Sequence, residues 1–275
     1  MNGLPPLTAL QQAFVRYGQS LHERSCAAVR FLSHHMGALA LAWCGIVALV
    51  GSAKVLTALS PIHGVSDLAA LVLPYMLIAL APIIGYRIAR ASFPAGASSP
   101  QPSIRLAAIG KWRKLDFAEA QAHPEFGPTG FMASLLIGML LNVVIRSFEF
   151  MLAVPAMNSH APGWGQAIFH VMAADVIVMN FFYMVAFVMA LRSVPLFPRM
   201  LLFAWVIDIA LQTTIATQVS AYKDLPVAVA APLNDLLQGN LTKVFISAAI
   251  WLPYLILSER VNVTYRRRSM VTAAR

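Results

Sequence analysis

Long stretches of this chain are hydrophobic and lack the polar interruptions that mark the exposed face of a water-soluble helix. Six of them are apparent, at residues 36–59, 68–88, 131–154, 167–191, 200–220 and 237–257. Each is about as long as the roughly 20 residues that a helix needs to cross a bilayer. The strands of a membrane barrel would alternate in polarity at every second residue. The pattern therefore predicts an all-α fold, a polytopic transmembrane helix bundle with about six spans.

The segments between these stretches divide the chain into five predicted regions. Residues 1–35 mix apolar residues with arginines, which predicts either an amphipathic helix on the membrane surface or a solvated leader. Residues 36–90 are expected to form a two-span hairpin, and residues 128–260 a four-span bundle. Residues 91–127 connect them and begin as a flexible linker rich in proline, glycine and serine. Residues 261–275 form a basic tail.

The composition and the charge distribution add an orientation to this picture. Hydrophobic residues make up 59% of the 275 residues and charged residues only 11%, whereas a soluble domain has roughly a quarter of its residues charged. Most of the 20 lysines and arginines lie in the leader, in the connections after the second and fourth spans, and in the tail. Because such residues collect on the cytoplasmic side, we expect both termini in the cytoplasm.

Basic residues that stand beside apolar ones predict contacts with anionic lipid at the cytoplasmic surface. One group lies within residues 91–127, the connection between the second and third spans (the 2–3 connection), and includes a tryptophan. The other is a run of arginines in the tail. A plain cytosolic loop is the alternative for the first group. The predicted lipid-anchoring residues are Lys111, Trp112, Arg113, Lys114, Arg266, Arg267 and Arg268. Membrane lipids are thus the expected partners, and nucleic acid is not.

Several short motifs in the second half of the chain resemble those of a known family. They read Ala249-Ile250-Trp251-Leu252-Pro253-Tyr254, Ser258-Glu259-Arg260-Val261, Thr264-Tyr265, Pro198-Arg199 and Gly127-Pro128-Thr129-Gly130-Phe131. Together, over roughly residues 125–268, they resemble the YdgK-like bacterial inner-membrane proteins. The resemblance implies a four-span helical unit in a bacterial inner membrane. It implies no activity, because the function of that family is unknown.

This chain differs from the family's pattern in three ways. It has an additional N-terminal pair of spans, it has no tryptophan where the third span begins, and Glu259 stands where a basic residue is usual.

Ionisable residues inside the spans are the main candidates for a functional site, because a charge at the bilayer centre costs about 2.5–3.5 kcal/mol on insertion scales. The candidates in the last four spans, together with one histidine, are Arg146, Glu149, Asp175, Asp208, Lys243 and His170. In one interpretation they form a polar cavity open to the outer side, in which Arg146 and Lys243 face the two aspartates. Such a cavity would bind an anionic or zwitterionic solute or a lipid head group. In the other interpretation they are ion pairs that fix the register of the helices.

The remaining chemistry of the sequence limits the functional hypotheses to three. No nucleophile elbow, nucleotide-binding loop or metal-ligand spacing occurs. The isolated His170 is expected to be a core or interface residue rather than a ligand, so we expect no cofactor. The first hypothesis is a non-enzymatic accessory or envelope component with a membrane-protein partner. The second is a transporter or lipid-handling protein that uses the intramembrane charges, and the third is a membrane enzyme acting on a lipid-linked substrate.

Overall fold

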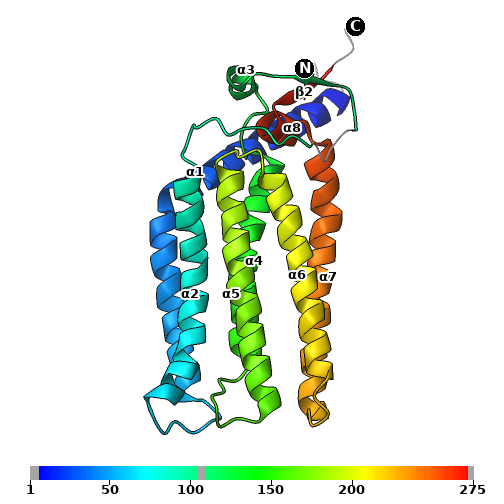
Figure 1. The fold of residues 1–275 in the computed structure, drawn as a ribbon. Helices are drawn as coiled ribbons and strands as arrows, with labels where there is room; N and C mark the ends of the chain where they lie inside the picture. The colour runs from blue at the N-terminus through cyan, green and yellow to red at the C-terminus, as the bar shows by residue number, and fades with distance from the viewer. Residues whose placement is uncertain (1–5, 105–108, 272–275) are drawn as a thin grey trace.

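Six long helices form the body of the protein. The computed structural model describes residues 6–104 and 109–271, with side chains described from residue 19 onward except for residue 21. The long helices are α1 (Pro6–Leu56), α2 (Val65–Ser92), α4 (Phe131–Ala153), α5 (Gly163–Leu191), α6 (Phe197–Ser220) and α7 (Val227–Leu257) (Figure 1). All six are long and apolar enough to cross a membrane. The predicted all-α bundle is therefore confirmed.

Prolines mark several of the helix ends. Val154 precedes Pro155 and is extended, as residues before proline prefer, so α4 ends at Ala153. Pro162 and Pro226 immediately precede α5 and α7. Pro198 lies in the first turn of α6, where its missing N–H would have no helical acceptor in any case.

Helix α5 is the centre of the bundle, because it packs against α2, α4 and α6. Of its most apolar stretch, 61% is buried inside the protein, against 17% for α7 at the edge. The contact with α2 is close at Gly85, where an added Cβ would lie 2.8 Å from the carbonyl oxygen of Phe181. A residue without a side chain lets the two backbones approach. This contact joins the predicted hairpin and the predicted four-span unit into one bundle.

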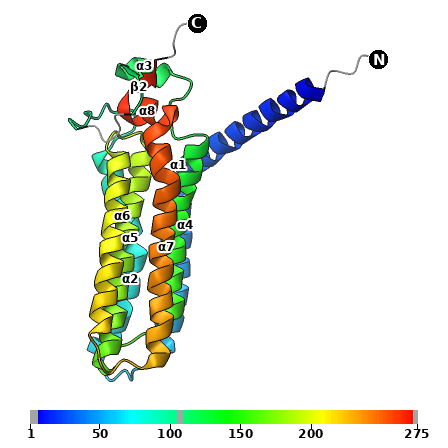
Figure 2. The same cartoon turned by 90° about the vertical axis from the view of Figure 1, so that its right-hand side faces the viewer.

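Helix α1 is longer than a bilayer requires. It is one continuous helix of 51 residues, or about 76 Å at 1.5 Å per residue, and it contains residues 6–35 of the predicted leader and residues 36–56 of the predicted first span. Figure 2 shows its N-terminal half leaving the bundle at an angle. The hydroxyl of Ser25 accepts a hydrogen bond from the backbone N–H of Gly130 at 2.8 Å, near the start of α4. From residue 6 onward the leader is thus helical, while its predicted place on the membrane surface stays a prediction.

The 2–3 connection and the tail fold together into a cap at the end of the bundle from which the N-terminal half of α1 emerges (Figure 1). The cap consists of β1 (Trp112–Lys114), α3 (Phe117–Ala122), α8 (Glu259–Arg266) and β2 (Arg268–Met270). The two strands pair antiparallel. The buried Tyr265 of α8 donates from its hydroxyl to the carbonyl oxygen of Ala190 at 2.9 Å, which fixes the cap to the end of α5.

The cap also brings together two of the segments that carry the family resemblance. Arg260 of α8 donates from Nη1 to the hydroxyl of Thr129 at 2.7 Å and forms an ion pair with Glu125. The backbone N–H of Gly127 donates to the hydroxyl of Thr264 at 2.9 Å. Residues 125–130 and α8 are therefore neighbours in space, although more than a hundred residues separate them along the chain.

Candidate functional site: a polar network beside a groove

Three of the predicted intramembrane charges meet inside the bundle. Arg146 of α4 donates from Nη1 to Oδ2 of Asp175 on α5 at 2.8 Å. Its Nη2 donates to both carboxylate oxygens of Asp208 on α6, at 2.5 and 2.6 Å. The exposed fractions of the three side chains are 6%, 6% and 0%. Buried charges need such paired, hydrogen-bonded partners. This ionic triad therefore connects α4, α5 and α6 at one level of the bundle.

Uncharged polar side chains extend the triad to a fourth helix. The hydroxyl of Tyr183 on α5 donates to Asp208 at 2.9 Å. Gln212, one turn after Asp208 on α6, donates to Asp175 at 3.1 Å. The Gln212 side-chain oxygen accepts in turn from Asn240 of α7 at 3.4 Å. A chain of hydrogen bonds thus runs from α5 through α6 to α7.

The remaining two charges form a separate pair near the surface of the bundle. Lys243 of α7 forms an ion pair with Glu149 of α4, and it lies 3.5 Å from the side-chain oxygen of Asn240. The side chains of Lys243 and Glu149 are 49% and 30% exposed. Lys243 therefore pairs with Glu149 rather than facing the two aspartates. The structure brings five of the six candidate residues into one network with a buried part and an open part.

A groove of about 370 Å³ lies between α4 and α7 and reaches Arg146. Figure 2 looks onto the bundle with α7 in front and α4 beside it. Tyr183 of α5 and Leu201 and Trp205 of α6 also line the groove. Its walls are mainly apolar and include Leu135, Leu141, Ile145 and Val244. Apolar walls with a few converging polar groups are typical of ligand sites.

Contacts between α4 and α7 lie at both ends of this groove. Near the cap, the ring of Phe131 stacks on Trp251, with centroids 4.7 Å apart, and meets the edge of Tyr254 at 5.0 Å. Farther from the cap, the Glu149–Lys243 pair joins the same two helices. The groove is therefore a window in the side of the bundle, bounded by an aromatic cluster at one end and an ion pair at the other.

His170 lies outside this network. Its side chain is exposed on α5, its Nδ1 is 2.8 Å from the carbonyl oxygen of Gln166, and its ring meets the ring of Phe169. Within the part of the chain that the structure describes, no group of three or more histidine, cysteine, aspartate or glutamate side chains is arranged to hold a metal ion.

The predicted lipid-anchoring residues all lie in the cap or at its edge, and several of them contact protein. The side chain of Arg268 is buried, donates to Asn262 at 2.8 Å and lies over the ring of Trp112. Arg267 lies over the ring of Phe117, 4.7 Å from its centroid. Lys111, Arg113 and Lys114 are exposed, and Arg266 is half-buried. Contact of this surface with anionic lipid stays a prediction.

Three members of the network were not among the predicted site residues. Tyr183 follows Asp175 by eight residues, Gln212 follows Asp208 by four, and Asn240 precedes Lys243 by three. Residues at these spacings share a face of a helix. A search for polar residues in helical register with each intramembrane charge would have found all three.

No family model matches the chain, and no curated protein or solved structure matches it either. The resemblance to the YdgK-like proteins therefore stays a prediction that depends on the quoted motifs.

Proposed function

We propose that this protein is a lipid-handling membrane protein that takes an amphipathic molecule sideways from the bilayer into the groove between α4 and α7. The observation that carries the proposal is the position of the groove, which opens in the side of the bundle between two apolar helices and ends at Arg146. A ligand that approaches along this surface comes from lipid rather than from water.

The lining of the groove indicates the chemistry of that molecule. Its apolar walls suit hydrocarbon, and the partly exposed Lys243 and Glu149 present both signs of charge. An anionic or zwitterionic head group can therefore find a partner there. Asp175 and Asp208 lie near the middle of their helices, and binding near the midplane is typical of proteins that move polar groups across a bilayer.

The other two hypotheses receive less support from the geometry. A membrane enzyme would need a free acid or base, but Arg146 is paired with both Asp175 and Asp208. An accessory component with a membrane-protein partner is a second candidate, because α7 is 17% buried over its most apolar stretch and leaves a wide surface for another helix.

The cellular setting that we propose is a bacterial inner membrane, with the cap in the cytoplasm. The connections at the end away from the cap, residues 57–64, 154–162 and 221–226, contain a single lysine or arginine, Lys223. The cap and its flanks hold most of the cations, in line with the positive-inside rule. Fusions of alkaline phosphatase and green fluorescent protein to the C-terminus test this orientation, and an active phosphatase fusion would contradict it.

The functional test is to fill the groove without touching a charge. Gly138 lines the groove, and a Cβ added there meets no atom within 4 Å. The Gly138→Phe variant should therefore fold and block the groove. Gly45 on α1 is also exposed, and a Cβ there likewise meets nothing within 4 Å. Gly45→Phe is thus a matched control that places the same side chain away from the groove.

The measurement is movement of a fluorescent zwitterionic phospholipid between the leaflets of proteoliposomes, together with lipid retention in native mass spectrometry. We expect Gly138→Phe to reduce both to the level of protein-free or lipid-free samples, and Gly45→Phe to behave as the wild type. Lipid retention without movement would favour the accessory component. If neither quantity depends on Gly138, the groove has no role in lipid handling.

A further inference from the structure

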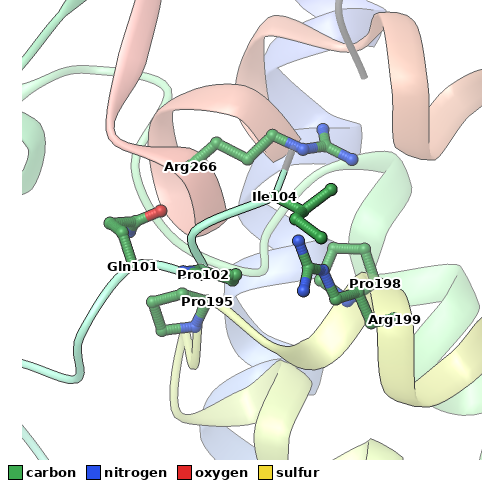
Figure 3. Close-up of a pocket in the computed structure, with 7 residues that line it drawn as sticks. All are labelled: Gln101, Pro102, Ile104, Pro195, Pro198, Arg199 and Arg266. Atoms are coloured by element: carbon green, nitrogen blue, oxygen red, sulfur yellow. The ribbon is translucent and has the colours of Figure 1, made fainter. Parts of the chain in front are cut away.

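A second, smaller cavity lies in the cap and is separate from the groove. It has a volume of about 20 Å³ and is lined by Gln101, Ile104, Arg199 and Arg266 together with three prolines. Figure 3 shows the two arginine side chains near one another, with Ile104 between their guanidinium groups in this view. Three segments far apart in the sequence form it: the connection after α2, the first turn of α6, and the end of α8.

Arg199 brings an unused hydrogen-bond donor to this cavity. Its Nη2 atom is buried and has no hydrogen-bond partner among the described residues. A guanidinium group has five N–H donors and no acceptor, and leaving a buried donor unpaired costs about 1–3 kcal/mol, more when it is charged. A group that accepts a hydrogen bond from Arg199 would remove that cost.

Arg266 is held in place beside the cavity by the protein. Its Nη1 donates to the carbonyl oxygen of Leu255 at 2.7 Å and to Asn262 at 3.1 Å. Burial, followed by the charges of Arg268 and Arg199, lowers the pKa of Arg266 to about 10. No carboxylate lines the cavity within the described part of the chain. The two arginines therefore lie close together without an opposing charge.

The start of α6 adds to the positive field at this place. Leu196, which precedes the helix, provides no side-chain cap, and no acidic residue lies in the first turn, so no negative side chain of this helix offsets the positive end of the helix dipole there. The helix end is only a supporting feature, and the charge comes mainly from the guanidinium groups.

We propose that this cavity binds one phosphate-type oxyanion, with Arg199 and Arg266 as its ligands, from either a phospholipid head group or a free phosphate. A volume of about 20 Å³ holds one water-sized group. One phosphate oxygen therefore enters the cavity, and the rest of the group lies at its opening beside Ile104, which is 71% exposed. Arginine suits this role because its planar N–H groups match the oxygens of a phosphate.

The test compares Arg199→Gln with Arg90→Gln in the full-length protein. Both changes remove one positive charge, but Arg90 is exposed in the last turn of α2 and does not line the cavity. The probes are phosphatidylglycerol and inorganic phosphate, added separately to protein in phosphatidylcholine nanodiscs. The readout is the rise of the thermal unfolding midpoint with probe concentration, which yields an apparent affinity.

We expect Arg199→Gln to weaken the apparent affinity about tenfold, equivalent to about 1.4 kcal/mol, and Arg90→Gln to leave it unchanged. A response to phosphatidylglycerol alone identifies a lipid head group as the ligand, and a response to inorganic phosphate identifies a free phosphate. Equal affinities in the wild type and in Arg199→Gln would overturn the proposal.

A second variant keeps the test decisive if Arg199→Gln fails to fold. Ile104→Glu places a carboxylate at the exposed edge of the cavity and leaves both arginines in place. The new charge would pair with the guanidinium groups and compete with the phosphate. It should weaken binding at least as much as Arg199→Gln does, and unchanged binding in this variant would again contradict the proposal.

Discussion

The polar network has two parts that use the same chemistry in different surroundings. In the triad, Arg146 and its two aspartates are at most 6% exposed, whereas Lys243 and Glu149 beside the groove are 49% and 30% exposed. Both parts are ion pairs between helices. The comparison teaches that burial decides whether an ion pair inside a span serves helix packing or can also meet a ligand. The buried triad joins three helices through mutually paired charges, and the open pair lies where a ligand in the groove would reach it.

This comparison leads to different energetic expectations for the two parts. Removing one partner of a buried ion pair leaves a charge without compensation and costs about 3–5 kcal/mol. Breaking an exposed pair typically costs about 1 kcal/mol or less. Substitutions in the triad should therefore act on the free energy of unfolding, and substitutions in the open pair on ligand binding.

The largest effect is expected for Arg146→Met. The change leaves two buried carboxylates without a cation, so we expect the free energy of unfolding to fall by about 3–5 kcal/mol. Unfolding in mixed micelles with increasing SDS measures it, with Lys243→Met as the control. Adding Asp175→Asn and Asp208→Asn to Arg146→Met should recover much of the loss, because the charges are then gone. A stable Arg146→Met single variant would show that the triad is not what holds α4, α5 and α6 together.

A smaller loss is expected for Asp208→Asn. Asp208 accepts two hydrogen bonds from Arg146 and one from Tyr183. The amide oxygen of an asparagine can still accept a hydrogen bond, so we expect a loss of about 1.5–3 kcal/mol, the contribution of one bond to a charged group. Asp175 leaves its Oδ1 without a partner among the described residues. Asp175→Asn should therefore cost less than Asp208→Asn in the same unfolding experiment. The reverse order would mean that the number of bonds in the structure does not rank the two carboxylates.

Tyr183→Phe should cost about 1–2 kcal/mol, because it removes one donor from a buried carboxylate. The exposed Tyr222 provides the matched control as Tyr222→Phe. A double-mutant cycle with Asp208→Asn should give a coupling energy of about 0.5 kcal/mol or more, since the two side chains are in contact. Fully additive effects would argue that the Tyr183 hydroxyl does not stabilise Asp208.

The smallest effect on stability is expected for Lys243→Gln, about 1 kcal/mol or less. The same change should reduce the amount of lipid retained in native mass spectrometry, because it removes one of the two cations that line the groove. The charge swap Lys243→Glu with Glu149→Lys keeps the pair and should unfold as the wild type does. If Lys243→Gln destabilises the protein as much as Arg146→Met, the distinction between the buried and open parts of the network fails.

The arrangement of the charges shows where reasoning from the sequence succeeds and where it stops. The candidate residues Arg146, Asp175 and Asp208 were identified because an ionisable side chain inside a span is rare and costly. Their partners could not be identified in the same way. Arg146 has both Glu149 and the aspartates within reach in principle, and only the rotation of α4 against α5 and α6 directs it to the aspartates.

The cap illustrates the same limit for secondary structure. Strands β1 and β2 have three residues each and lie more than 150 residues apart in the sequence. Such short segments carry no periodicity of their own, and they pair only where the connection after α2 meets the tail in space. The arginines of the tail were expected to face lipid, but Arg268 is buried against Trp112 and Asn262.

The sequence by itself determined the number of membrane-length helices and most of their ends, because length, apolarity and the prolines near the ends act locally along the chain. The starts of α1 and α7 are the exceptions, since these helices begin at Pro6 and Val227 rather than at the predicted residues 36 and 237. The sequence also determined which side chains would be costly to bury. Only the tertiary structure decided that α5 lies at the centre and α7 at the edge, that a groove remains between α4 and α7, and that Arg199 meets Arg266. These features depend on how helices far apart in the sequence pack, and similar apolar helices can pack in many ways.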